Sequence, residues 1–114
     1  MTRWLLLVAL VACKRDAAAP PPDEHAVAPI PAAEAKRGQD ACNAYVTQVC
    51  ACTTPAAKQA CGLARALADA VQTGLEVSAS PDTSRQDTLQ TQDHVRKTIK
   101  SCIEETAKLP TLGC

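Results

Sequence analysis

The stretch ACNAYVTQVCACTTPAAKQAC, Ala41 to Cys61, decides the fold of this chain. Before Thr54, apolar residues recur every three or four positions, which is the period of one face of an α-helix. Thr54-Pro55 then indicates a new helix start, because a threonine hydroxyl caps free N–H groups and proline suits the first helical position. The stretch predicts a first helix, beginning between Ala32 and Asp40 and ending before Thr54, and a second helix directly behind it.

Apolar spacing also predicts how far the second helix extends. Pro55 to about Val77 keeps the helical period, and Gly62 and Gly74 should weaken it slightly. Its apolar stripe consists of Ala60, Ala64, Leu67, Val71 and Leu75.

A second start signature, Ser80-Pro81, predicts a third helix from Pro81 to about Lys108. Its apolar stripe lies in the second half, so the first half is predicted to be exposed or frayed. The stripe residues are Val95, Ile99, Cys102 and Ile103. The opposite face is predicted to be solvated, with Asp93–Lys97, Lys100–Glu104 and Glu104–Lys108 spaced for ion pairs. Its residues are Asp93, Arg96, Lys97, Lys100, Glu104 and Lys108.

Large apolar side chains are too few to stabilise this fold by packing alone. The chain has 114 residues, no Phe, one Tyr and one Trp, and a domain of this size buries little of its surface. We therefore predict an all-α fold, a small three-helix antiparallel bundle stapled by disulfides. Twelve basic and twelve acidic residues cancel, which argues against a nucleic-acid partner.

An apolar run stands near the start of the chain. Trp4 to Ala12 follows Arg3, a pattern typical of an export signal. The run is far shorter than the roughly 20 residues that a transmembrane helix needs. Its end, Leu10-Val11-Ala12-Cys13, resembles the lipobox of bacterial lipoproteins.

That resemblance implies cleavage just before Cys13, acylation of the Cys13 thiol and a further acyl chain on the new amino terminus. Two or more acyl chains hold a protein stably on a membrane. Lys14, where an Asp would favour the inner membrane, favours the outer membrane facing the periplasm. The alternative is an ordinary cleaved signal, or a start site assigned too early, with Cys13 an incidental thiol.

Proline placement divides the rest of the chain. Five of the eight prolines lie between Pro20 and Pro31, in a stretch of alanine, proline and charge that has little to bury. Such a stretch is predicted to be a disordered or polyproline-like tether. The predicted division is 1–12 for the signal peptide, 13–33 for the lipid anchor and tether, and 34–114 for the disulfide-stapled helical domain.

Once Cys13 is set aside, the cysteines are even in number and are predicted to pair, since exported thiols oxidise. Each cysteine is placed by its height along the bundle, taking a rise of about 1.5 Å per residue and turns near Thr53 and Ala79. The favoured pairs are Cys42 with Cys61, Cys50 with Cys102, and Cys52 with Cys114. The chief alternative pairing is Cys52 with Cys61 across the short turn.

The predicted function is that of a lipid-anchored envelope module with a structural or protein-interaction role. An envelope protein of unknown identity would meet an exposed helical face, such as the polar start of the third helix. The alternative is a thiol-based copper or redox carrier using Cys50 and Cys52, since close thiols bind soft metals. We predict no enzyme, cofactor, metal site or small-molecule substrate, because no zinc, haem, phosphate-loop or hydrolase motif is present and His25 and His94 read as solvated side chains.

Overall fold

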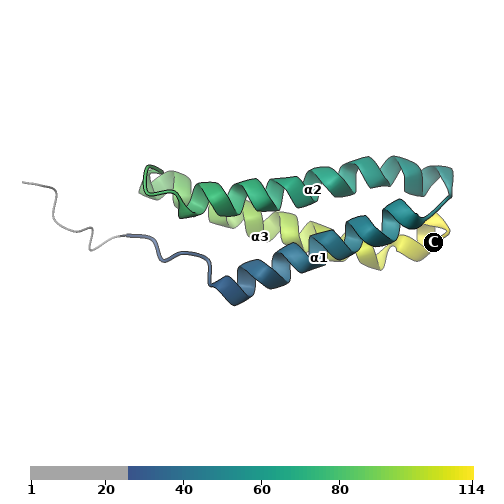
Figure 1. Ribbon diagram of the computed structural model, residues 1–114, viewed down its shortest axis with the longest axis horizontal. Coiled ribbons are helices and arrows are strands. Elements are labelled where there is room, and N and C mark those ends of the chain that lie inside the picture. The colour runs from purple at the N-terminus through teal and green to yellow at the C-terminus, as the bar shows by residue number, and fades with distance from the viewer. Residues whose placement is uncertain (1–25) are drawn as a thin grey trace, which may run out of the picture.

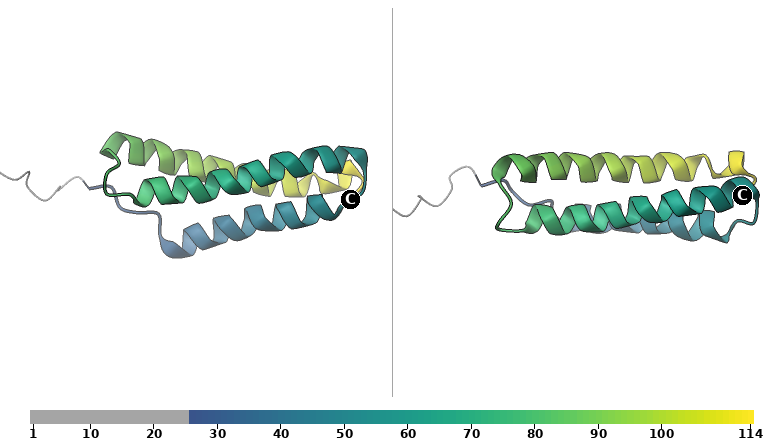
Figure 2. Two further views of the ribbon diagram at one scale, coloured as in Figure 1. Left: turned by 45° about the horizontal axis from the view of Figure 1, so that its top comes forward. Right: turned by 90° about the horizontal axis from the view of Figure 1, so that it is seen from above.

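The computed structural model describes residues 26–114, which fold into three long helices and one short one (Figure 1). These are α1 (Ala32–Ala51), α2 (Pro55–Ala79), α3 (Arg85–Ala107) and the 3₁₀ helix η1 (Leu109–Leu112). Consecutive long helices run antiparallel and lie side by side in all views (Figure 2). The predicted all-α three-helix antiparallel bundle is confirmed, and no strand occurs in this part of the chain.

The start of α2 lies where the Thr54-Pro55 signature predicts it. The N–H of Ala57 donates to the Thr54 hydroxyl at 3.2 Å, and Pro55 occupies the first helical turn. This cap satisfies one of the N–H groups that a helix start leaves free. The helix continues to Ala79, two residues beyond the predicted end.

The predicted start of the third helix is wrong. The helix α3 begins at Arg85, and Ser80, the expected cap, instead ends α2 by donating its N–H to Val77 O. Ser84 caps α3 through a reciprocal pair with Asp87, whose N–H lies 3.1 Å from the serine oxygen and whose carboxylate accepts from it at 2.6 Å. A carboxylate three residues after the cap is favourable at the positive end of a helix, and Ser80 has none there.

The first half of α3 is mostly exposed, as predicted, but it is continuous helix and not frayed. Thr88 and Gln92 are buried there, and their polar groups are satisfied. The Gln92 amide donates to the Ala28 carbonyl at 2.9 Å, and the Thr88 hydroxyl donates to the Ser84 carbonyl at 2.9 Å. Hydrogen bonds thus stabilise a segment that has few apolar residues.

The boundary predicted at Ala33 between tether and domain lies further toward the N-terminus. Ile30 packs on the core cluster around Val71 and Val95, and α1 begins at Ala32 without a side-chain cap. The folded unit therefore includes residues 26–33. The rest of the predicted tether and the signal, residues 1–25, lie outside the described residues.

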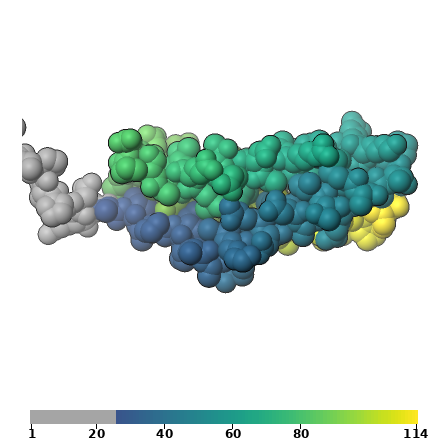
Figure 3. All heavy atoms as spheres, viewed as in Figure 1, coloured from purple at the N-terminus to yellow at the C-terminus, as the bar shows by residue number. Residues whose placement is uncertain are grey.

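The core is thin and divides into two clusters along the bundle. Tyr45 and Val49 fill the end near the α1–α2 turn, and Val71 and Val95 fill the other, all with no exposed surface. Glycine residues let the helices approach each other closely. Figure 3 shows α1 and α2 packed against each other along the bundle, with the C-terminal residues emerging at one end.

Two glycines mark these close approaches, and one of them was expected only to weaken its helix. A Cβ atom at Gly74 would overlap the Val95 side chain, and one at Gly38 would overlap Ile99. Gly62, by contrast, faces open space. Gly74 therefore has a packing role between α2 and α3 that helix propensity alone does not reveal.

Candidate functional site

Three disulfides pair every cysteine within the described residues. Cys42 is bonded to Cys102, Cys50 to Cys61, and Cys52 to Cys114, with Cα–Cα distances of 5.0, 4.8 and 5.6 Å. The predicted pair Cys52–Cys114 is confirmed. The predicted pairs Cys42–Cys61 and Cys50–Cys102 are wrong, and the alternative Cys52–Cys61 does not form.

Both wrong pairs arise from the register of the helices. The prediction placed turns near Thr53 and Ala79, whereas α2 begins at Pro55 and α3 at Arg85. The extended backbone of Cys52 and Thr54 carries the chain beyond the end of α1 before α2 turns back, so Cys61 lies level with Cys50. The connection 80–84 places the second turn further along the chain than predicted, so Cys102 lies level with Cys42.

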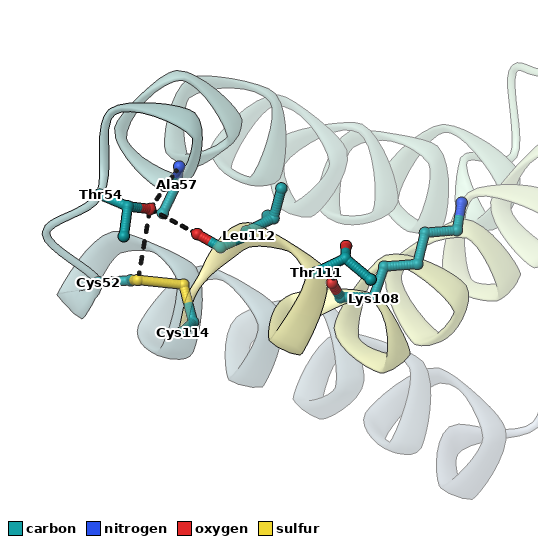
Figure 4. Close-up of a disulfide and its surroundings, with 7 residues drawn as sticks. All are labelled: Cys52, Thr54, Ala57, Lys108, Thr111, Leu112 and Cys114. Atoms are coloured by element: carbon teal, nitrogen blue, oxygen red, sulfur yellow. Dashed lines mark hydrogen bonds between the residues drawn. A yellow bond between two sulfur atoms is a disulfide. The ribbon is translucent and has the colours of Figure 1, made fainter.

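One end of the bundle is closed by the Cys52–Cys114 disulfide and by Thr54 beside it (Figure 4). The Thr54 hydroxyl donates to the Leu112 carbonyl at 2.7 Å while it accepts from the N–H of Ala57. The same oxygen lies 3.8 Å from the sulfur of Cys52. A single side chain therefore links the start of α2, the disulfide and the C-terminal tail.

The tail reaches Cys52 because the chain reverses after η1. Gly113 has a φ of 80°, a left-handed conformation that favours glycine, and it ends η1. Thr111 donates to the Lys108 carbonyl at 2.5 Å, which tightens the turn between α3 and η1 (Figure 4). This reversal brings Cys114 back to the top of α1, beside Cys52.

The cysteine and histidine side chains were the candidates for thiol or metal chemistry. Cys50 and Cys52 belong to two different disulfides, so the close pair does not offer two thiols. Residues 26–114 contain no cluster of three or more His, Cys, Asp or Glu side chains suited to a metal ion. His94 is exposed on α3 beside the Asp93–Lys97 ion pair, and His25 lies outside the described residues.

The most distinctive binding feature is an apolar groove of about 610 Å³ between α1 and α3, which we call the α1/α3 groove. Ile99 and Ile103 form its floor with Gly38, and Ile103 is 56% exposed. Charged side chains surround this floor. They are Glu34, Arg37, Arg96, Lys100 and Glu104.

The charged side chains at one end of the α1/α3 groove form a close ion pair, whereas those at the other end are only weakly paired. The Arg96 guanidinium donates to both Glu34 oxygens, at 2.7 and 3.4 Å, and this hydrogen bonding lowers the pKa of Glu34 and raises the pKa of Arg96. Lys100 and Glu104 are 3.7 Å apart and both well exposed, so their pair is weak. Arg37 forms no close ion pair within residues 26–114, and its charge acts on Glu34 only at longer range.

Sequence reasoning identified part of this surface but not the groove. The predicted pairs Asp93–Lys97 and Lys100–Glu104 are confirmed, while Lys108 pairs with Glu105 at 2.8 Å instead of Glu104. The Ile103 side chain was expected in the core stripe. Its exposure depends on where α1 crosses α3, and helical period does not reveal that.

Comparison with protein-family models, with curated proteins and with solved structures finds no match to this chain. Among residues 26–114, no helix has both the length and the apolar character to cross a bilayer. The cysteines, the helical surface and the α1/α3 groove are therefore the features of the chain that bear on its function.

Proposed function

We propose that this protein is a lipid-anchored, non-enzymatic helical module of the bacterial cell envelope that acts by binding another protein molecule. One observation carries the proposal: the six cysteines of the helical domain pair among themselves. The seventh is Cys13, at the end of the lipobox-like stretch. Disulfides persist in an oxidising compartment, and an export signal would direct the chain to such a compartment.

The path of the chain is compatible with an anchor at one end of the bundle. Residues 26–31 approach beside the α2–α3 connection, and the Cys52–Cys114 disulfide closes the opposite end (Figure 1). Thirteen residue steps separate Cys13 from Ala26, and at about 3.3 Å each they span at most about 43 Å. The bundle would stand within that distance of the membrane, with the outer membrane facing the periplasm preferred.

The α1/α3 groove supports a binding role over a purely structural one. Exposed apolar residues ringed by charges are typical of protein contact sites. The exposed start of α3, which the sequence suggested as the contact face, lacks such an apolar floor apart from Leu89. We therefore place the binding surface at the α1/α3 groove.

Disulfide pairing counts against the alternative of a copper or redox carrier. A carrier built on Cys50 and Cys52 would need two thiols at once, and each sulfur is bonded to a different partner. Two disulfides would have to be reduced before the pair could bind a soft metal. Intact mass before and after alkylation tests this directly, because a carrier would show at least two reactive thiols without reduction.

Cell fractionation of the Cys13→Ala variant tests the anchor. We expect the normal chain in the membrane fraction and the variant either soluble or with its signal uncut. The matched control removes Cys52 and Cys114 together, which leaves Cys13 in place and no unpaired thiol in the domain. Equal membrane retention and normal processing of Cys13→Ala would refute the lipoprotein assignment.

A further inference from the structure

The floor of the α1/α3 groove is unusual for a chain with so few large apolar residues. Ile103 is 56% exposed one turn away from Ile99, which packs against the backbone of α1 at Gly38. Covering both side chains would remove apolar surface from water, which favours association. The question is what covers them.

Charged side chains of both signs surround the floor. In an antiparallel pair of copies, the positive charges of one copy would face the negative charges of the other. Lys100 and Glu104 lie one turn apart on α3, on the same side as Ile103. Their mutual pair is long and exposed, so either side chain can exchange its partner at little cost. A two-fold axis would set the lysine of each copy near the glutamate of the other, as a self-complementary interface requires.

The register of such a pairing can be worked out from the contacts. If Ile103 of one copy meets Ile99 of the other in antiparallel helices, facing residue numbers add to 103 + 99 = 202. Lys100 then faces position 102 of the second copy, two residues from Glu104, which is about 3 Å along a helix. One register therefore satisfies the isoleucines and the charges together.

Arg37 fits the same register. Glu34 contacts Arg96 and Gly38 contacts Ile99, so Arg37 lies at about the height of position 98 on α3. Position 98 faces position 104 in this register, because 98 + 104 = 202. Arg37, which has no close ion-pair partner within residues 26–114, would meet Glu104 of the second copy.

We propose that the α1/α3 groove is occupied by the same groove of a second copy of this chain, giving a two-fold homodimer. This inference rests on the proposed binding role of the groove and not on the lipid anchor. The chain's own segment 14–25 is a poor occupant, since it contains no Leu, Ile, Val or aromatic residue. Self-complementary charge favours a second copy over an unrelated helix.

Sedimentation equilibrium of the full-length protein in a density-matched nonionic detergent tests the dimer. We expect Ile103→Glu to weaken the dimer at least tenfold. The matched control is Leu63→Glu on α2, where the side chain is equally exposed at 55% but lies outside the groove. A normal chain that stays monomeric up to about 100 μM, where even weak specific pairs associate, would overturn the proposal.

A charge exchange separates an interface effect from a loss of folding. Lys100→Glu and Glu104→Lys should each be largely monomeric, because like charges then face each other across the axis. Mixed together, they should form a heterodimer, since two opposite-charge pairs return even though one Arg37 then faces a lysine. Failure of the mixture to associate, or equal loss from Leu63→Glu, refutes the self-association.

Each outcome also bears on the rest of the functional proposal. The normal chain could be monomeric and still bind a different protein, with that binding lost in Ile103→Glu. The homodimer would then be wrong, and the binding role of the groove would stand. If the dimer forms while Cys13→Ala behaves like the normal chain in fractionation, the anchor is wrong and the dimer stands. The two failures are therefore distinguishable.

Discussion

Cys42 of α1 and Cys102 of α3 are bonded in the interior of the bundle, with exposed fractions of 1% and 0%. Their disulfide joins the first helix to the third, and Cys50–Cys61 joins the first to the second near their turn. No disulfide among residues 26–114 joins α2 directly to α3. The contact between α2 and α3 depends on side-chain packing, which includes the close approach of Gly74 to Val95.

Disulfide mapping without reduction distinguishes the observed pairing from the one predicted by height. Trypsin alone cannot, because Cys42, Cys50 and Cys52 fall in one fragment, 38–58. Added chymotrypsin cuts after Tyr45 and isolates Cys42 in fragment 38–45. We expect mass spectrometry to find that fragment joined to 101–108, which holds Cys102. Joining to 59–65, which holds Cys61, would contradict the structure.

Two glycines of α2 should respond oppositely to alanine. Gly62→Ala should stabilise the fold by about 1 kcal/mol, since the site is open and alanine favours helix. Gly74→Ala should destabilise it by about 1–2 kcal/mol, because overpacking against the buried Val95 outweighs the same propensity gain. Urea unfolding of both variants measures the difference, and equal effects would show that α2 and α3 do not approach closely at Gly74.

Two hydrogen bonds at the closed end make Thr54 the most sensitive hydroxyl there. Thr54→Ala removes the cap of α2 and the bond to the Leu112 carbonyl, and should cost about 1–2 kcal/mol of unfolding free energy. Thr54→Ser should keep most of it. The exposed neighbour Thr53 is the control, and Thr53→Ala should change thermal stability little. Similar losses from both alanine variants would contradict the role assigned to Thr54.

The Glu34–Arg96 pair makes a pH-dependent contribution to stability. Hydrogen bonding to Arg96 holds the pKa of Glu34 below its usual value of 4.5. A carboxyl whose pKa is lowered by folding stabilises the fold above its ordinary pKa, and this contribution is lost as the pH falls through the folded value. NMR titration should find the Glu34 pKa lowered in the normal chain and higher in Arg96→Ala. An unchanged Glu34 pKa in the variant would mean that the pair does not form in solution.

Local chemistry in the sequence determined the elements of this fold. The apolar period before Thr54 and the Thr54-Pro55 cap act within one or two turns of chain, so α1 and the start of α2 could be predicted. The even set of cysteines predicted a stapled bundle for the same reason, since pairing in general follows from composition and compartment. Ser84 and Asp87 carried an equally local signal for α3, which the competing Ser80-Pro81 signature obscured.

Tertiary structure alone decided which residues meet across the helices. A pairing such as Cys42–Cys102 depends on the exact height of each helix, and each connection of a few residues shifts that height by an amount that local preferences do not specify. The Cys52–Cys114 pair is predicted correctly because Cys114 lies beyond α3, in a tail that turns back at Gly113, so its height does not depend on the register of the helices. The crossing of α1 over α3 likewise decided that Ile99 is packed on Gly38 while Ile103, of the same apolar stripe, faces solvent in the groove.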